Sequence, residues 1–190
     1  MLTERAPRNS ALREQFHQSD TLTSMPVPTD DRLQKNAHVM ACALEAGTTT
    51  GLQTICDVFL GDASDFYGVP KPGVRVLAAR PLRVREGGWS SELFGDYSPT
   101  TLQVRVWMRT AVRKQVTSFG TFLSTLCHEL CHHLDYHRFK FSDSWHTRGF
   151  YERTAVLYHH SRGTDLKKLC WVRLRGGQWR IDWRRTQRGV

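Results

Sequence analysis

Apolar residues recur every three to four positions in several stretches of the chain, a spacing that is typical of amphipathic helices. Gly47 ends the first stretch, and the threonines at 48–50 offer caps for the next one. Thr117 or Ser118 can cap a later stretch whose leucines fall on one stripe. The spacing therefore predicts helices over residues 31–45, over a segment that holds Leu52 to Leu60, and over residues 119–136 and 147–159.

Two other segments have the pattern of strands. Residues 102–109 alternate apolar and polar side chains, which predicts a half-buried strand. Residues 74–85 are rich in branched side chains but contain Pro81, so a strand there must be bulged, bent or at a sheet edge. Helices ahead of a small mixed sheet place the chain in the α+β class.

Residues 1–30 are polar and lack a sustained period, and we expect them to form a flexible leader. The first ten residues lack the apolar core of a secretory signal, and no apolar run approaches the roughly 20 residues of a membrane span. These features predict a cytoplasmic protein that does not bind membranes. The five cysteines include no C-x-x-C pair, so we expect buried thiols rather than disulfides or a Cys-based zinc ribbon. A length of 190 residues suits one domain.

His128 and His132 lie four residues apart on the predicted helix 119–136, in the sequence His-Glu-Leu-Cys-His. Two histidines at this spacing point about 40° apart around a helix, so both can bind one ion. Glu129 follows the first histidine and can reach a water that such an ion activates, as the general base of a hydrolase. The motif predicts a catalytic metal site, and a catalytic zinc needs a third protein ligand.

Helical geometry excludes two candidates for this third ligand. His133 points about 140° and His137 about 180° away from His128 around the helix, so neither can share its ion. Arg138 stands where a metzincin has its third histidine, which excludes that class of enzyme. His146 and Glu152 remain, with thirteen and nineteen residues between them and His132, and spacing alone does not separate them.

The segment 128–132, followed after a polar aromatic loop by His146-Thr147-Arg148-Gly149-Phe150, resembles the SprT-like (Spartan-type) zinc metallopeptidase family. The resemblance covers residues 50–161 and is sharp only around the histidines. It implies a zincin-like, minimal metalloprotease fold with Zn²⁺ as cofactor, His128, His132 and His146 as its ligands, and Glu129 as catalytic base. Thr147 stands where the family often has glycine, and the chain has only Cys170 where many members carry a Cys-rich ribbon.

Further side chains are candidates for supporting roles around such a site. A histidine that binds a metal usually donates its other ring N–H to an acceptor, and the candidates here are Asp135 and Asp143. A tyrosine often stabilises the oxyanion in such sites, and the candidates are Tyr97, Tyr151 and Tyr158.

Positive charge is concentrated at the end of the chain. The net charge is +9, and residues 162–190 carry nine basic against two acidic side chains. Such a field favours a polyanionic partner such as DNA. Residues 170–183 predict a hairpin about the glycines at 176 and 177, with an apolar face that packs on the domain and with Arg173 directly across from Arg180. Facing arginines destabilise a strand pair unless an anion lies between them. The predicted nucleic-acid-binding residues are Trp171, Arg173, Arg175, Arg180 and Arg184.

These observations divide the chain into the leader 1–30, a SprT-like zincin metallopeptidase domain over 31–161, and a basic hairpin or tail over 162–190. We expect a zinc-dependent endopeptidase that cleaves protein or peptide substrates and that its basic end brings to DNA or nucleoprotein. The alternative is a nucleic-acid-binding module in which zinc is structural or absent and no peptide is cleaved. A third hypothesis is a regulatory zincin-like protein that cleaves one dedicated partner. Residues 101–109 are expected to be an edge strand that binds substrate backbone by strand addition.

Overall fold

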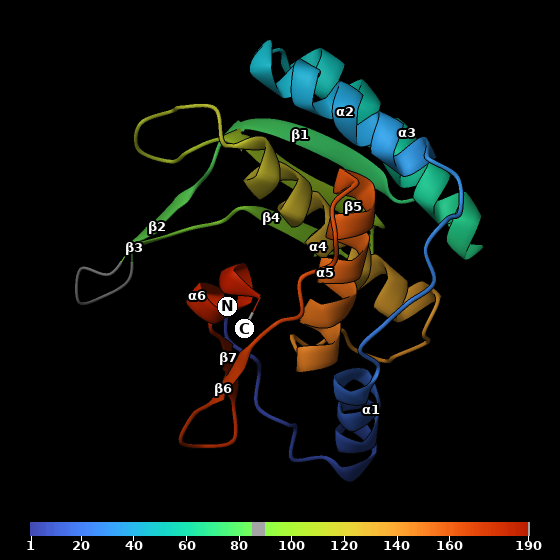
Figure 1. Ribbon diagram of the computed structural model, residues 1–190, viewed down its shortest axis with the longest axis vertical. Helices are drawn as coiled ribbons and strands as arrows, with labels where there is room; N and C mark the ends of the chain where they lie inside the picture. The colour runs from blue at the N-terminus through green and yellow to red at the C-terminus, as the bar shows by residue number, and fades with distance from the viewer. Residues whose placement is uncertain (85–89, 190) are drawn as a thin grey trace.

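A three-stranded mixed sheet lies at the centre of the computed structural model, which describes residues 1–84 and 90–189 (Figure 1). Strand β1 (Gly73–Ala79) pairs in parallel with β5 (Gln103–Arg109), and β4 (Gly95–Ser98) pairs antiparallel with the other side of β5. Two smaller sheets pair β2 (Leu82–Val84) with β3 (Ser90–Glu92) and β6 (Trp171–Arg173) with β7 (Trp179–Ile181). The expected α+β class with a small mixed sheet is confirmed.

Each helix that the apolar spacing predicts is present: α2 (Arg32–Glu45), α3 (Thr49–Tyr67), α4 (Phe119–His137) and α5 (Arg148–Arg162). The Ser118 side chain caps α4 by accepting the N–H of Thr121, and the Thr147 side chain caps α5 by accepting the N–H of Phe150. The second cap places the start of α5 immediately after His146. In the part of the chain that the structure describes, no helix is both long and apolar enough to cross a membrane.

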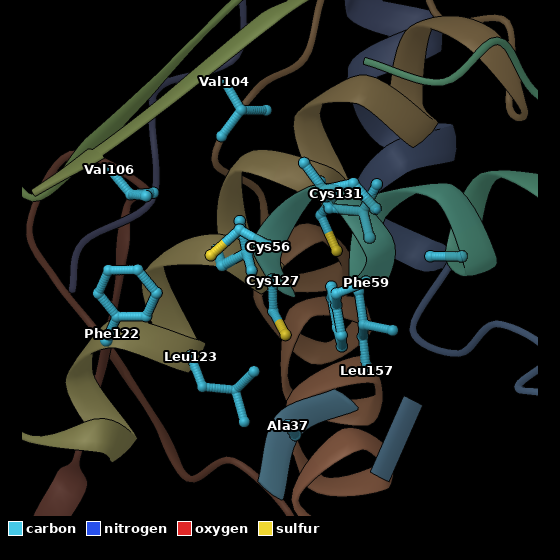
Figure 2. Close-up of a cluster of buried hydrophobic side chains, with 14 of the residues drawn as sticks. Ala37, Cys56, Phe59, Val104, Val106, Phe122, Leu123, Cys127, Cys131 and Leu157 are labelled. Atoms are coloured by element: carbon cyan, nitrogen blue, oxygen red, sulfur yellow. The ribbon is translucent and has the colours of Figure 1, made fainter. Parts of the chain in front are cut away.

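The main core lies between one face of the sheet and the helices. Val104 and Val106 of β5 are fully buried, whereas Arg105 between them is exposed, as expected for a half-buried strand. Figure 2 shows these valines together with side chains from the helices, among them Cys56 of α3 and Cys127 of α4. Helix α4 packs against β4 and β5 on one side and against α5 on the other, so the core fixes the helix that carries the histidine motif.

Residues 1–30 are not the unstructured leader that their polarity suggested. Residues Ser10–Thr21 form helix α1, which the side chain of Asn9 caps. Phe16 packs edge-on against Trp145 with ring centroids 6.0 Å apart. The buried Ser19 hydroxyl lies 3.0 Å from that of Thr147. The segment is part of the fold, and it supports the loop that carries His146.

The expectation that residues 101–109 form an edge strand is wrong, because β5 is the central strand of its sheet. The edge beside α4 belongs to the short strand β4. At the other predicted strand, Pro81 separates β1 from β2, which agrees with the break expected there. Arg85, the predicted end of that strand, lies outside the described residues.

The predicted C-terminal hairpin is present, but its register is shifted by one residue. Trp171 lies opposite Ile181 and Arg173 opposite Trp179, so Arg173 and Arg180 do not face each other. The cause is a longer loop over residues 175–177, closed by the Leu174 N–H, which donates to the Gln178 carbonyl at 2.9 Å. The argument from facing arginines to a bound anion is therefore wrong.

Both ends of the chain meet at this hairpin, as Figure 1 shows. The Thr3 N–H donates to the Trp179 carbonyl at 2.8 Å, and the Ile181 N–H donates to the Met1 carbonyl at 3.3 Å. A short helix, α6 (Trp183–Arg188), follows β7, so Trp183 and Arg184 are helical and do not extend the hairpin. The first residues of the chain thus lie along β7 as an added strand segment.

Candidate metal centre

Three histidines converge at the junction of α4 and α5. His128 and His132 lie one turn apart on α4, and His146 lies just before the cap of α5. The Nε2 atom of His128 is 3.1 Å from that of His132 and 3.0 Å from that of His146, and the three residues are close enough to bind one metal ion. Glu152, the other candidate third ligand, instead accepts the indole N–H of Trp171 at 2.9 Å.

Hydrogen bonds on the far side of the rings fix which nitrogens carry protons. The Ser144 hydroxyl donates to Asp135 at 2.8 Å, so it can only accept at its 2.8 Å contact with Nδ1 of His132. The Glu4 carboxylate accepts from Nδ1 of His146 at 2.7 Å. Both rings therefore carry their proton on Nδ1 and turn the lone pair of Nε2 toward His128.

This arrangement of donors fits a cation. A single proton on His128 could satisfy only one of the two lone pairs that face it, whereas a metal ion would accept all three Nε2 atoms. The Nδ1 atom of His128 is buried and has no hydrogen-bond partner among the described residues. Burial, with the neighbouring His146, lowers the pKa of His128 to about 3, and burial with the other two rings lowers the pKa of His132 well below its usual value. Neutral imidazoles are the form that binds metal ions.

Glu129 lies beside the three histidines, and its side chain packs against the edge strand β4. Its side chain is 5% exposed, and a Cβ at Gly95 of β4 would lie 2.8 Å from its Oε1 atom. Only a residue without a side chain leaves room there for the carboxylate. Burial, with the charge of Asp96, raises the pKa of Glu129 to about 8, and a cation held by the histidines would lower this pKa again.

A buried ion pair anchors the hydrogen-bond network behind the ligands. Asp135 and Arg153 are both fully buried, and their side chains contact each other at 2.7 Å. Arg153 also donates to the carbonyls of Ser19 and Leu22, which ties the network to α1. Because Asp135 holds Ser144, this pair positions His132 through one intervening side chain.

The acceptors for the ligand histidines therefore differ from the two that the sequence suggested. Asp135 acts only through Ser144, and Asp143 accepts the Tyr136 hydroxyl at 3.1 Å instead of contacting a ligand. Neither Ser144 nor Glu4 was among the residues predicted from the sequence. Ser144 is recognisable only as a hydroxyl close to His146 in the chain, and Glu4, 142 residues away from it, has no signal in the sequence.

His133 and His137, the two histidines that helical geometry excluded, both contact Tyr97. His133 donates from Nε2 to the Pro70 carbonyl at 2.7 Å, so its Nδ1 accepts the Tyr97 hydroxyl at 2.9 Å. The Tyr97 hydroxyl thus donates its only proton to His133 and has none left to stabilise an oxyanion. The other two tyrosines named as candidates point their hydroxyls elsewhere, because Tyr151 donates to the Leu2 carbonyl at 3.2 Å and Tyr158 contacts the guanidinium of Arg162.

Two cavities meet at Glu129. One, of about 440 Å³, is lined by Asp96, Tyr97 and Tyr136 together with all three histidines. The other, of about 940 Å³, lies along α4, α5 and the C-terminal segment. Leu93, Gly95, His128 and Glu129 line both cavities. The histidine cluster is therefore accessible from a cleft that extends to either side of it.

The residues predicted to bind nucleic acid do not form one surface. Arg173, Arg175, Arg180 and Arg184 are exposed, as a binding role requires. Trp171 is half-buried: its indole donates to Glu152, and its ring lies 6.1 Å from that of Tyr151. Trp171 therefore packs on α5, and its predicted stacking on a base stays a prediction.

Comparisons of the chain with models of known protein families, with curated proteins and with solved structures found no match. The functional argument therefore depends on the residues of this chain and their geometry.

Proposed function

We propose that the protein is a zinc-dependent endopeptidase of the SprT-like, zincin kind, with His128, His132 and His146 as ligands and Glu129 as general base. The observation that supports it most is the convergence of three imidazoles beside a buried glutamate in an open cleft. Three histidine ligands with an open fourth position are typical of catalytic zinc. A structural site would be closed by a fourth protein ligand, and the described residues provide no fourth member of the cluster.

A zinc ion bound there would lower the pKa of a water toward about 7 and polarise the carbonyl of the scissile bond. In the proposed reaction Glu129 takes a proton from the attacking water and returns it to the leaving amine. Gly95 leaves the space in which the Glu129 carboxylate turns toward the cleft. The edge strand β4 lines the smaller cavity and offers backbone groups that can hold an extended peptide by strand addition.

Metal content and cleavage test the proposal on four full-length proteins. We expect about one zinc per chain in the wild type and in Glu152→Ala, and loss of zinc in His146→Ala. Glu129→Gln should keep its zinc and lose cleavage of an unfolded protein substrate. The matched control is Glu152→Ala, because Glu152 lies on α5 but outside the cluster. A wild type that binds no metal, or a Glu129→Gln variant that still cleaves, contradicts the proposal.

A second candidate function is nucleic-acid binding by the exposed arginines of the C-terminal segment. The concentration of nine basic against two acidic side chains over residues 162–190 favours it. The full-length variant Arg180→Gln with Arg184→Gln should bind single-stranded DNA more weakly and with a shallower dependence on salt. An unchanged salt dependence would place any DNA binding elsewhere.

A further inference from the structure

The larger cavity extends away from Glu129 along α4 and α5. Hydroxyl side chains of α4, at Thr121, Ser124 and Thr125, line part of it, and it also has apolar residues from the segment just before β4, from α5 and from the C-terminal segment. These apolar residues are Phe94, Tyr151, Ala155, Leu169, Ile181 and Trp183. At about 940 Å³ the cavity has room for several side chains.

Three basic side chains line the same cavity: His159, Arg162 and Lys167. The guanidinium of Arg162 lies against Gly120, where a Cβ would be 2.9 Å from its Nη1 atom. The three residues line one cavity, and burial together with the charges of Lys167 and Arg162 lowers the pKa of His159.

Among the described residues, Arg162 and Lys167 have no carboxylate partner. Glu92 also lines the cavity, but its carboxylate is bound to Arg80 at 3.0 Å. The basic group therefore gives this part of the cavity a positive potential that a bound anion would complement.

The distance from the metal cluster to the basic group follows from helix geometry. Gly120 and His128 are eight residues apart on α4, which is about 12 Å at 1.5 Å per residue. An extended peptide advances about 3.3 Å per residue. A side chain that reaches Arg162 therefore belongs to a residue about three or four positions from the bond at the metal centre.

We propose that this cavity selects peptide substrates with apolar residues beside the scissile bond and an acidic side chain three or four residues away, which Arg162 and Lys167 bind. This inference rests on the proposed peptidase function, because the distance is counted from its reaction centre. The apolar side chains that line the cavity fit peptide side chains better than they fit a sugar-phosphate backbone. The occupant to which the structure points is thus an acidic peptide segment.

Binding tests the inference without turnover. Fluorescent peptides that are neutral except for one Glu, moved one position at a time, are titrated into full-length Glu129→Gln, with Gln and Lys peptides for comparison. Because Arg162 and Lys167 are exposed, we expect the best Glu peptide to bind roughly two- to fivefold more tightly than its Gln counterpart. The change Arg162→Glu with Lys167→Glu should remove that preference. Arg113→Glu with Lys114→Glu, an exposed basic pair outside the cavity, should retain it. Equal binding of Glu and Gln peptides overturns the inference.

Cleavage of the same peptides by the wild type separates this inference from the proposed function. Cleavage three or four residues from the Glu, located by mass spectrometry, supports both. Cleavage at positions that do not depend on where the Glu lies overturns the inference and leaves the peptidase function intact. A Glu preference in binding without any cleavage contradicts the peptidase function and supports the acidic-peptide site. Another outcome is that Glu and Gln peptides bind alike, while the variant with Arg162→Glu and Lys167→Glu alone loses binding of single-stranded DNA. The cavity would then be a nucleic-acid site, and the inference would be overturned.

Discussion

Removal of one carboxylate far from the histidine motif in the sequence should weaken the metal site. Glu4 accepts from Nδ1 of His146 at 2.7 Å, and its backbone N–H donates to the His146 carbonyl at 3.0 Å. Glu4→Ala removes the first bond, together with the 3.3 Å bond that the same carboxylate accepts from the His146 backbone N–H, and keeps the second. His146 then loses the acceptor that holds its proton on Nδ1 and its Nε2 lone pair toward the other ligands.

The magnitude follows from the exposure of this contact. A hydrogen bond to a charged group contributes about 1.5 to 3 kcal/mol. Because the Glu4 side chain is 46% exposed, the lower value applies. A loss of about 1.5 kcal/mol is about a tenfold weaker metal affinity. This lies at the lower end of the roughly 10- to 100-fold range for groups that orient metal ligands.

Competition with a chromophoric chelator measures the affinity for Zn²⁺, and the visible spectrum of the Co²⁺-loaded protein reports the ligand geometry. Glu4→Gln keeps a neutral acceptor and should lose less affinity than Glu4→Ala. Glu14→Ala, an exposed glutamate on α1, is the matched control and should bind as the wild type does. A Glu4→Ala variant with affinity within about twofold of the wild type and an unchanged Co²⁺ spectrum would refute the reasoning.

Three further substitutions test other parts of the structure. Gly95→Ala puts a Cβ 2.8 Å from Oε1 of Glu129, so it should lower cleavage while metal content stays at the wild-type level, and normal cleavage would contradict the close packing. Gly149→Ala puts a Cβ 2.1 Å from the Ser19 carbonyl oxygen, so thermal unfolding should show a free energy of unfolding about 1–3 kcal/mol lower than that of the wild type. In the control Gly61→Ala, the new Cβ meets only the Lys71 side chain at 3.6 Å, and stability should not fall. Arg153→Met leaves Asp135 buried without its partner, so urea unfolding should show a loss of about 3–5 kcal/mol in the free energy of unfolding. Adding Asp135→Leu should recover part of this loss. Equal stability of the wild type, the single variant and the double variant would contradict the role of the ion pair.

The sequence predicted the features that depend on local periodicity. The four long helices follow from apolar spacing, and His128 and His132 are close enough to bind one ion because they are one turn apart. Periodicity did not predict the third histidine of the cluster. The spacing allowed both His146 and Glu152, and only the family resemblance favoured His146. The structure brings His146 to the other two histidines and places Glu152 against Trp171.

The errors arose where tertiary contacts decide the outcome. Helix α1 buries few apolar side chains, and it is held by the ion pair of Asp20 with Arg148 and by Phe16 against Trp145, partners that lie far away in sequence. Alternation over residues 103–109 marks a half-buried strand but does not distinguish an edge from a centre. In the hairpin, Gly176 and Gly177 both have positive φ, at 94° and 84°, and one more loop residue moved every following side chain to the other face.

The metal centre depends on both ends of the chain, although its motif is local. Two ligands come from one turn of α4, but the orientation of the third depends on Glu4, whose neighbour Thr3 is hydrogen-bonded to Trp179 of β7. A metal ion stabilises the fold only through states in which all three ligands are in place. Because displacing either the first residues or the hairpin would withdraw Glu4, binding of the ion favours the state in which both ends are docked. The basic C-terminal segment, which the sequence predicted to pack on the domain, is in this way connected to His146 through two hydrogen bonds and the Thr3–Glu4 peptide bond.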